Sequence, residues 1–266
     1  MKFDMHCHTK EGSPDGSIPI EQYISILKNK GFGGMVISDH NSYNGYRNWK
    51  KYIKGTMHTD FVVLKGIEYD TIDAGHFLII MPETLKIPIL ELRGLPILLL
   101  IEIVHRYGGI IGPTHPCGER YLSYINTKKR RNKASTIEKF DFVESFNACE
   151  PFQSNKEANE LAKLYQKPGF GGSDAHRIDC IGMAYTNFPE TITSESELIR
   201  YVKSGAEITC GGELYRGTTK EKIGFLNHVL LQIFWVYNKT AGLFHKSKRS
   251  KELKKKDMKK KTEGFS

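Results

Sequence analysis

The chain has 266 residues, of which 39% are hydrophobic and 26% are charged, as in one large soluble domain with a sizeable buried core. Its net charge of +9 is uneven, because His245–Ser266 carries ten basic and three acidic residues and so contributes +7. Its five cysteines are scattered and lack CxxC spacing, which argues against a disulfide framework or a thiolate zinc site and favours a reducing compartment.

The first element is a predicted strand over residues 2–9, KFDMHCHT, in which apolar and polar side chains alternate. The apolar row consists of Phe3, Met5 and Cys7. Because side chains two apart in a strand share a face, His6 and His8 lie side by side on the opposite face. Neutral imidazoles in this arrangement are a candidate pair of metal ligands. By itself the stretch leaves open the alternative of two histidines at the solvated end of an edge strand.

Further strands and helices alternate along most of the chain. The strands are predicted at 33–41, 60–70, 76–81, 108–116, 140–148 and 169–176, and the helices at 18–31, 44–55, 95–109 and 155–167. This alternation is typical of an α/β fold with a largely parallel sheet, and seven strands are nearly enough for a closed barrel. The strand at 76–81 follows its predecessor after the short turn DTIDAG, so that pair departs from strict strand–helix alternation.

The C-terminal part continues the same domain with a strand at 184–188, a helix at 194–205 and a strand at 206–212. We therefore expect one domain over 1–217, followed by an amphipathic helix over 218–244 and a polybasic, disordered tail over 245–266. The helix is expected to pack on its own domain, with dimerisation or membrane-surface docking as alternatives.

Two basic segments bear on partners. Residues 127–133, TKKRRNK, form a predicted surface loop, and 245–266 form the tail. Such runs are most often solvated, with contact to nucleic acid or an anionic membrane surface as the alternative. The N-terminus lacks the basic flank and apolar stretch of a signal peptide, and the apolar runs fall short of the ~18 residues of a transmembrane helix. We expect a cytoplasmic protein, with peripheral membrane association as the alternative.

The placement of the histidines is the main functional signal. Five of them end or directly follow a predicted strand, and a sixth begins the strand that returns after the short turn. These are His6, His8, His40, His115 and His176, and then His76. Carboxylates are also expected near these strand ends: Asp15, Asp39, Glu68 and Asp174. The C-terminal strand ends of a parallel α/β barrel share one rim. So many ionisable groups gathered there without partners would cost free energy, which bound metal ions would offset. His, Asp and Glu without cysteine suit Mn²⁺, Zn²⁺ or Fe²⁺.

The ordered motifs HCHT, SPDGS, SDHN, GIEYD, GHFLII, THP and GGSDAH resemble those of the polymerase and histidinol phosphatase (PHP) domain family. The resemblance runs from about residue 2 to residue 176, and MAYTNF is similar to the family's C-terminal extension. It implies a distorted seven-stranded (βα) barrel of the TIM type that binds two or three divalent ions at its C-terminal rim.

The resemblance also implies the metal ligands. His6, His8, Glu68 and Asp174 would surround one ion, and Glu68 would bridge to a second ion. His76 and His115 would hold that second ion, and Asp15, His40 and His176 would hold the third. Asp15 stands where some members of the family have His. Asp39, beside His40, is a candidate orienting residue behind the ligands.

Family members mostly hydrolyse phosphoesters, so the expected nucleophile is a hydroxide that bridges two ions, with Asp174 and His176 in catalytic positions and no protein nucleophile. Cys7 points away from His6 and His8 and is rejected in that role. Arg120 and Arg177 follow two of the motifs and are candidate substrate anchors, with ordinary surface arginines as the alternative.

The leading hypothesis is a metal-dependent phosphatase or phosphoesterase acting on a small phosphorylated metabolite or nucleotide. An exonuclease-like phosphodiesterase on short oligonucleotides is the second, motivated by the basic loop and tail. A protein phosphotyrosine phosphatase is the third. A module that retains the metal site for binding without turnover is the alternative outside the enzymes.

Overall fold

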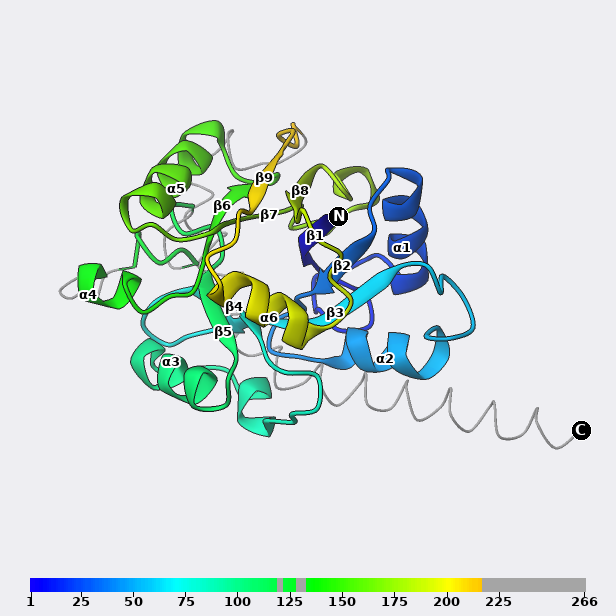
Figure 1. The fold of residues 1–266 in the computed structure, drawn as a ribbon, viewed down its shortest axis with the longest axis horizontal. Helices are drawn as coiled ribbons and strands as arrows, with labels where there is room; N and C mark the ends of the chain where they lie inside the picture. Colours follow the sequence, from blue (N-terminus) through cyan, green and yellow to red (C-terminus); the bar gives the residue numbers. More distant parts are fainter. Residues whose placement is uncertain (119–121, 128–132, 217–266) are drawn as a thin grey trace, which may run out of the picture. The chain divides into compact units, whose positions relative to one another are not determined.

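The computed structural model describes residues 1–118, 122–127 and 133–216, which form an α/β unit (Figure 1). The strands are β1 Lys2–Cys7, β2 Gly34–Ile37, β3 Val62–Asp70, β4 His76–Ile80, β5 Ile110–Pro113, β6 Val143–Asn147, β7 Gly169–Gly172, β8 Ala184–Asn187 and β9 Thr209–Gly212. The helices are α1 Ile20–Asn29, α2 Asn44–Tyr52, α3 Ile97–Arg106, α4 Lys133–Ile137, α5 Phe152–Leu164 and α6 Glu195–Lys203, with short 3₁₀ turns η1 Pro88–Glu91 and η3 Ile178–Cys180.

The strands form a curled seven-stranded sheet in the order β5-β4-β3-β2-β1-β8-β9 and a separate pair, β6-β7. Strand pairs β1–β2, β2–β3 and β6–β7 are parallel, whereas β1–β8, β3–β4, β4–β5 and β8–β9 are antiparallel. The prediction of a mixed α/β fold is confirmed, but the prediction of a largely parallel sheet is wrong. The turn between β3 and β4 is too short for a parallel crossover, so β4 must run back along β3.

The pair β6-β7 lies between the two sides of the curl. Just before β6, the Asp141 N–H donates to the Ile111 carbonyl of β5 at 2.9 Å. Just after β7, the Asp174 N–H donates to the His6 carbonyl of β1 at 2.9 Å, and a parallel bridge joins Cys7 to Ala175. The ends of β1, β3, β6 and β7 are thereby brought to one rim, although a regular (βα) barrel remains a prediction.

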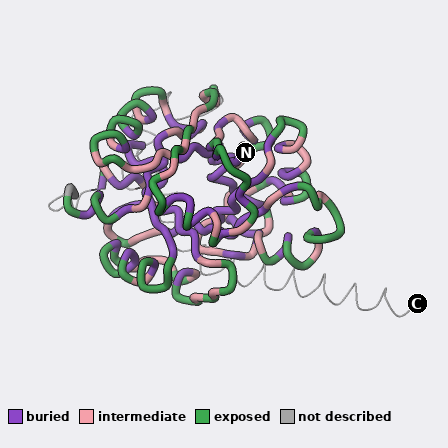
Figure 2. Tube along the Cα trace, viewed as in Figure 1, coloured by how far each residue is buried: buried purple, intermediate pink, exposed green. Residues whose placement is uncertain are grey.

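The core has an inner and an outer part. The inner cluster contains Phe3, Val36, Leu64 and Phe170 from the strands, together with Phe142 just before β6, and is covered by apolar residues of α6. The outer clusters fill the space between the sheet and α1 and α2, and between the sheet and α3. The helices thus surround the strands, with buried positions inside and exposed positions outside (Figure 2).

Strand β1 departs from strict alternation. Its ladder with β2 shifts register between Asp4 and Cys7. As a result Phe3 and Met5 pack in the inner cluster, whereas Cys7 packs against α1 in an outer cluster. The predicted single face for Phe3, Met5 and Cys7 is therefore wrong, because a bulge shifts the residues beyond it to the opposite face. Cys7 does point away from the histidines, as predicted.

The predicted helix over 218–244 and the basic tail over 245–266 lie outside the described residues, so the proposed domain limits at 217 and 244 stay predictions. Within the described ranges, every helix is too short or too polar to cross a membrane.

Candidate metal centre

The fold gathers all nine predicted ligands at one rim of the curled sheet. They come from the end of β1, the loops after β1, β2, β5 and β7, the interior of β3 and the start of β4. The nine are His6, His8, Asp15, His40, Glu68, His76, His115, Asp174 and His176. His6, His8 and Glu68 are almost completely buried, while His176 is the most accessible of the group.

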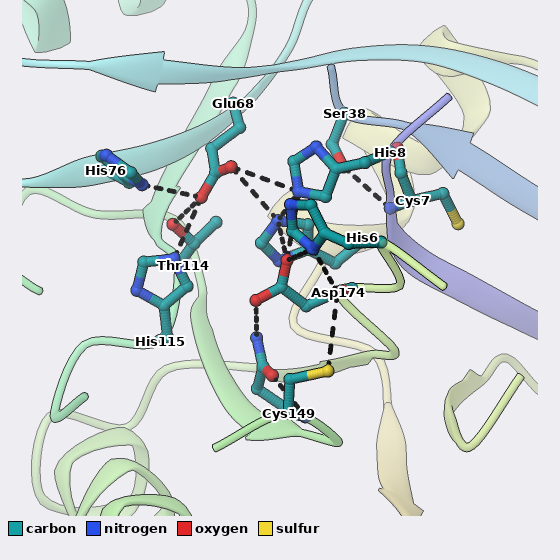
Figure 3. A network of polar contacts seen from close by, with 12 residues as sticks. His6, Cys7, His8, Ser38, Glu68, His76, Thr114, His115, Cys149 and Asp174 are labelled. Carbon is teal, nitrogen blue, oxygen red and sulfur yellow. Dashed lines mark hydrogen bonds and ion pairs between the residues drawn. The ribbon is translucent and has the colours of Figure 1, made fainter. Parts of the chain in front are cut away.

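Glu68 lies at the centre of the cluster. Figure 3 shows its carboxylate between His76 and His115 on one side and His6 and His8 on the other. Oε1 lies 3.2 Å from His76 Nδ1 and 3.1 Å from His115 Nε2. Oε2 lies 3.4 Å from Nε2 of both His6 and His8. One carboxylate thus faces two groups of imidazoles with its two oxygens, which is the arrangement of a bridging ligand.

The HxH pair converges as the strand geometry predicts. The Nε2 atoms of His6 and His8 are 3.0 Å apart, and Asp174 Oδ1 lies 3.1 Å from His8 Nε2 and 3.6 Å from His6 Nε2. Two imidazole nitrogens at this distance need either a hydrogen or a cation between them. Ligands held at ~2.1 Å from one ion lie roughly 3 Å apart, so this spacing fits a shared cation.

A second group contains Asp15, His40 and His176, with His8 close enough to join it. Asp15 Oδ2 lies 3.4 Å from His40 Nε2 and 3.3 Å from His176 Nε2. His8 stacks on both imidazoles, with ring centroids 4.7 Å from His40 and 4.4 Å from His176. The resemblance assigned His8 to another ion, whereas here it lies between the two groups.

Sequence reasoning missed Asp70, the last residue of β3. Its Oδ1 lies 3.1 Å from His76 Nε2 and 3.6 Å from His40 Nδ1, so a third group forms from His40, Asp70 and His76. The available signal was its position two residues after Glu68, on the same face of the strand. Antiparallel pairing opposite His76 then places it at the rim.

A second layer of side chains, also missed, fixes these imidazoles. Glu144 of β6 contacts His6 Nδ1 through Oε1 at 2.8 Å and accepts from the backbone N–H of His115 through Oε2 at 2.5 Å. The Asn147 amide donates to Glu144 Oε2 at 3.1 Å and to Asp174 Oδ2 at 3.2 Å. Partners of this kind orient ligands and set which imidazole nitrogen is available.

The remaining predicted residues occupy different places. Asp39 is buried and accepts from the N–H and hydroxyl of Thr9, so it holds the loop that follows the HxH pair. Arg177 is exposed, with its Nε 3.4 Å from Asp179 Oδ1. Arg120 lies outside the described residues. Another basic side chain, Arg93, does reach the cluster, with its Nη2 2.7 Å from Asp70 Oδ2.

The electrostatics of the cluster separate its imidazoles. Burial disfavours the charge on His176, but the Asp15 and Asp174 carboxylates outweigh it and raise its pKa to about 9. Burial together with the neighbouring His176 lowers the pKa of His8 to about 4. The pKa of Glu68 lies well below its usual range, because the surrounding imidazoles outweigh the effect of burial.

Backbone strain also concentrates here. His115 and Asp174 have positive φ angles of 31° and 50°. Residues other than glycine rarely adopt this conformation, which costs of order 1–3 kcal/mol and persists where the surroundings impose it. In both residues the strained backbone directs a polar side chain into the cluster.

The residues present fit divalent cations. Among the described residues, buried side-chain atoms without a hydrogen-bond partner include Asp15 Oδ1, His40 Nδ1, Asp70 Oδ1 and His76 Nδ1, all in the cluster. Buried polar atoms are normally satisfied, and shared cations would give all four atoms a partner. The donors are nitrogen and oxygen without sulfur, which suits Mn²⁺, Zn²⁺ or Fe²⁺.

Two family models together match most of the chain. The sequence model of the PHP domain matches residues 4–165, and that of the PHP-associated domain matches residues 152–207. The comparison with curated proteins found no match.

Solved structures share the fold. PsfC from Pseudomonas syringae matches with a TM-score of 0.59 at 12% identity, over 88% of this chain and 98% of that protein. A Bifidobacterium adolescentis protein described with the words metal-dependent phosphoesterase matches with a TM-score of 0.54 at 13% identity, over 77% of this chain and 96% of that protein. Endonuclease Q from Pyrococcus furiosus matches with 0.58 at 17% identity, over 79% of this chain and 57% of its own length. At these identities the likeness concerns the fold alone.

Proposed function

The chain belongs to the PHP domain family, and from that premise we propose that it is a metal-dependent phosphoesterase acting on a small phosphorylated metabolite or nucleotide. The observation that carries the proposal is the buried cluster around Glu68, in which nine predicted ligands meet. Two of the similar structures are described with the words metal-dependent phosphoesterase, which supports the same class of reaction.

The proposed ligands fall into three groups. Glu68, with His6, His8 and Asp174, would hold one ion, and Glu68 would share a second ion with His76 and His115. Asp15, His40 and His176 would hold a third. When bound, such ions neutralise phosphate charge and lower the pKa of water toward ~7, which supplies a nucleophile at neutral pH.

The protein's own part is to orient these groups. Glu144 fixes the ring of His6, and the Asn147 amide holds the carboxylate of Asp174. The Thr114 hydroxyl donates to Glu68 Oε1 at 2.8 Å, which fixes the central carboxylate. These bonds pre-set the positions of the ligands, so little reorganisation is required during the reaction.

Arg93 is proposed to bind the substrate phosphate. Its loop is attached to the end of β3, because the Gly94 N–H donates to the Asp70 carbonyl at 2.8 Å. The guanidinium contacts one oxygen of Asp70 while the other oxygen faces His76. A partly exposed guanidinium held at the edge of a metal cluster can form a bidentate contact with a phosphate.

The test is Mn²⁺-dependent turnover of p-nitrophenyl phosphate beside bis(p-nitrophenyl) phosphate, for wild type and Asp174→Asn. We expect monoester turnover that requires metal and falls by roughly 100-fold in the variant, since the carboxylate contacts both His6 and His8. Metal-loaded protein that hydrolyses neither ester would contradict the proposal and favour a module that retains the metal site for binding without turnover.

A nuclease is the second candidate, favoured by the likeness to Endonuclease Q, whose structure was solved with a duplex containing an abasic lesion. The basic segments 127–133 and 245–266 would then contact nucleic acid. Diester preference, steep loss of oligonucleotide cleavage with salt, and weaker binding after deletion of 245–266 would support this candidate. Deletion without effect on cleavage, lipid binding or oligomeric state would leave the tail a solvated appendage.

A further inference from the structure

Two cysteines meet behind the proposed ligand Asp174. Cys149 follows β6 and Cys180 ends η3, and their sulfur atoms are 3.1 Å apart. Neither is in a disulfide. Cys180 is buried, whereas Cys149 is partly accessible to solvent, so a small oxidant can reach one member of the pair.

The two loops that carry these cysteines are already held together. The Tyr215 N–H donates to the Ala148 carbonyl at 2.7 Å, and the Tyr215 hydroxyl donates to Asp179 Oδ2 at 2.7 Å. Tyr215 therefore bridges the residue before Cys149 and the residue before Cys180. This bridge keeps the sulfur atoms close, and formation of an S–S bond of ~2.05 Å requires an approach of only about 1 Å.

The pair is connected to Asp174 through two routes. The Cys149 thiol contacts the carbonyls of Ser173 at 3.4 Å and Asp174 at 3.6 Å, and the Cys180 thiol contacts the Ser173 carbonyl at 3.3 Å. Figure 3 shows the sulfur of Cys149 directed toward Asp174. In addition, the Cys149 N–H donates to Asn147 Oδ1 at 2.9 Å, and the Asn147 amide donates to the Asp174 carboxylate.

We propose that Cys149 and Cys180 form a reversible disulfide that weakens metal binding through Asp174. With hydrogen peroxide as the oxidant, the Cys149 sulfur attacks one peroxide oxygen, the O–O bond breaks, and a sulfenic acid and water result. The Cys180 sulfur then attacks the Cys149 sulfur, so that the S–S bond forms and the S–O bond breaks with loss of a second water. Two electrons and two protons pass from the thiols to peroxide.

The effect on the metal centre rests on the proposed function, whereas the disulfide itself does not. Closure of the S–S bond removes both thiol hydrogens from the Ser173 and Asp174 carbonyls and pulls the Cys149 backbone that holds Asn147. Asp174 has a positive φ and depends on its surroundings for its conformation. Disturbed positioning groups typically cost 10–100-fold in metal affinity, and we expect about tenfold weaker Mn²⁺ binding.

The experiment treats the reduced, full-length protein with hydrogen peroxide and measures intact mass, accessible thiols and the crosslinked peptide. We expect a loss of about 2 Da and a single Cys149–Cys180 link, reversed by dithiothreitol. Cys149→Ser and Cys180→Ser should not form the link. Cys210→Ser is the matched control, because Cys210 is also partly accessible but contacts Ser145 instead of a second cysteine, and it should form the link at the wild-type rate.

Mn²⁺ titrations of the oxidised and reduced wild type complete the test. A mass gain without a link, a link between other cysteines, or a link that leaves the Mn²⁺ affinity unchanged would each overturn the proposal. Reduced protein that binds no Mn²⁺ would instead contradict the proposed function, while the mass measurement would still decide whether the disulfide forms.

Discussion

At the scale of single residues, Glu68 is the group on which the centre depends. It is buried and contacts imidazoles on every side, so its charge offsets theirs when no metal is present. We expect Glu68→Gln to lower metal-dependent turnover by roughly 100-fold or more and to reduce the number of bound ions. Metal analysis and turnover measure both effects. Asp141→Asn is the control, because Asp141 pairs with His105 outside the cluster at 2.9 Å and should not affect metal content.

Arg93 provides a second test at this scale. If its guanidinium binds the substrate phosphate, Arg93→Met should raise KM for a phosphomonoester about tenfold and change kcat much less. The matched control is Arg47→Met, since Arg47 forms its own ion pair with Glu91 and has no such contact with Asp70. Equal effects of the two substitutions would show that Arg93 has a merely structural role.

At the scale of elements, the centre requires β1 and β7 to approach each other closely. Gly172 makes this possible, because an added Cβ would lie 2.2 Å from His6 Cβ and 2.7 Å from the His6 nitrogen. Relief of that clash must displace β1, which carries the proposed ligand His6 and leads directly into His8. We expect Gly172→Ala to lower the free energy of unfolding by about 3 kcal/mol and to weaken metal binding.

Urea unfolding and Mn²⁺ titration would measure these two effects. Gly211→Ala is the control, because Gly211 also lies in a strand but its Cβ would meet Tyr185 Oη at an ordinary 3.5 Å. We expect it to cost about 1 kcal/mol or less. A Gly172 variant as stable as this control would show that β1 and β7 can separate without loss of the fold.

At the scale of the whole molecule, pH should affect the metal-free and metal-loaded proteins differently. His176 has a folded pKa of about 9, above its unfolded value near 6.5, so its contribution to stability is complete below pH 6.5 and is lost as pH rises toward 9. His8 has a folded pKa of about 4, so its neutral form is favoured and stability is lost as pH falls from 6.5 toward 4.

Metal-free protein should therefore be most stable near pH 6.5 and less stable at pH 9. Bound ions require neutral imidazoles, so Mn²⁺ affinity should rise over the same range and the loaded protein should keep its stability. Thermal unfolding in EDTA and in Mn²⁺ from pH 5 to 9.5 would test this. Metal-free stability that rises steadily to pH 9 would contradict the assigned pKa of His176.

The sequence by itself determined the family, the mixed α/β class and the residues expected at the rim. These inferences depend on local patterns: two histidines at strand spacing, motifs in a given order, and ionisable residues at predicted strand ends. Residues two apart in a regular strand share a face, which local sequence is enough to predict wherever no bulge intervenes. The candidate ligand pair His6 and His8 could therefore be proposed before any tertiary contact was known.

Only the tertiary structure decided what distant segments do to one another. It made four of the six strand pairs in the seven-stranded sheet antiparallel, and it placed Glu144 on a histidine 138 residues away. It also brought Asp70 and Arg93 to the cluster and Cys149 into contact with Cys180. The bulge that turns Cys7 away from Phe3 and Met5 also arises from pairing with β2. Such contacts depend on strand register and loop closure, which no local pattern of side chains specifies.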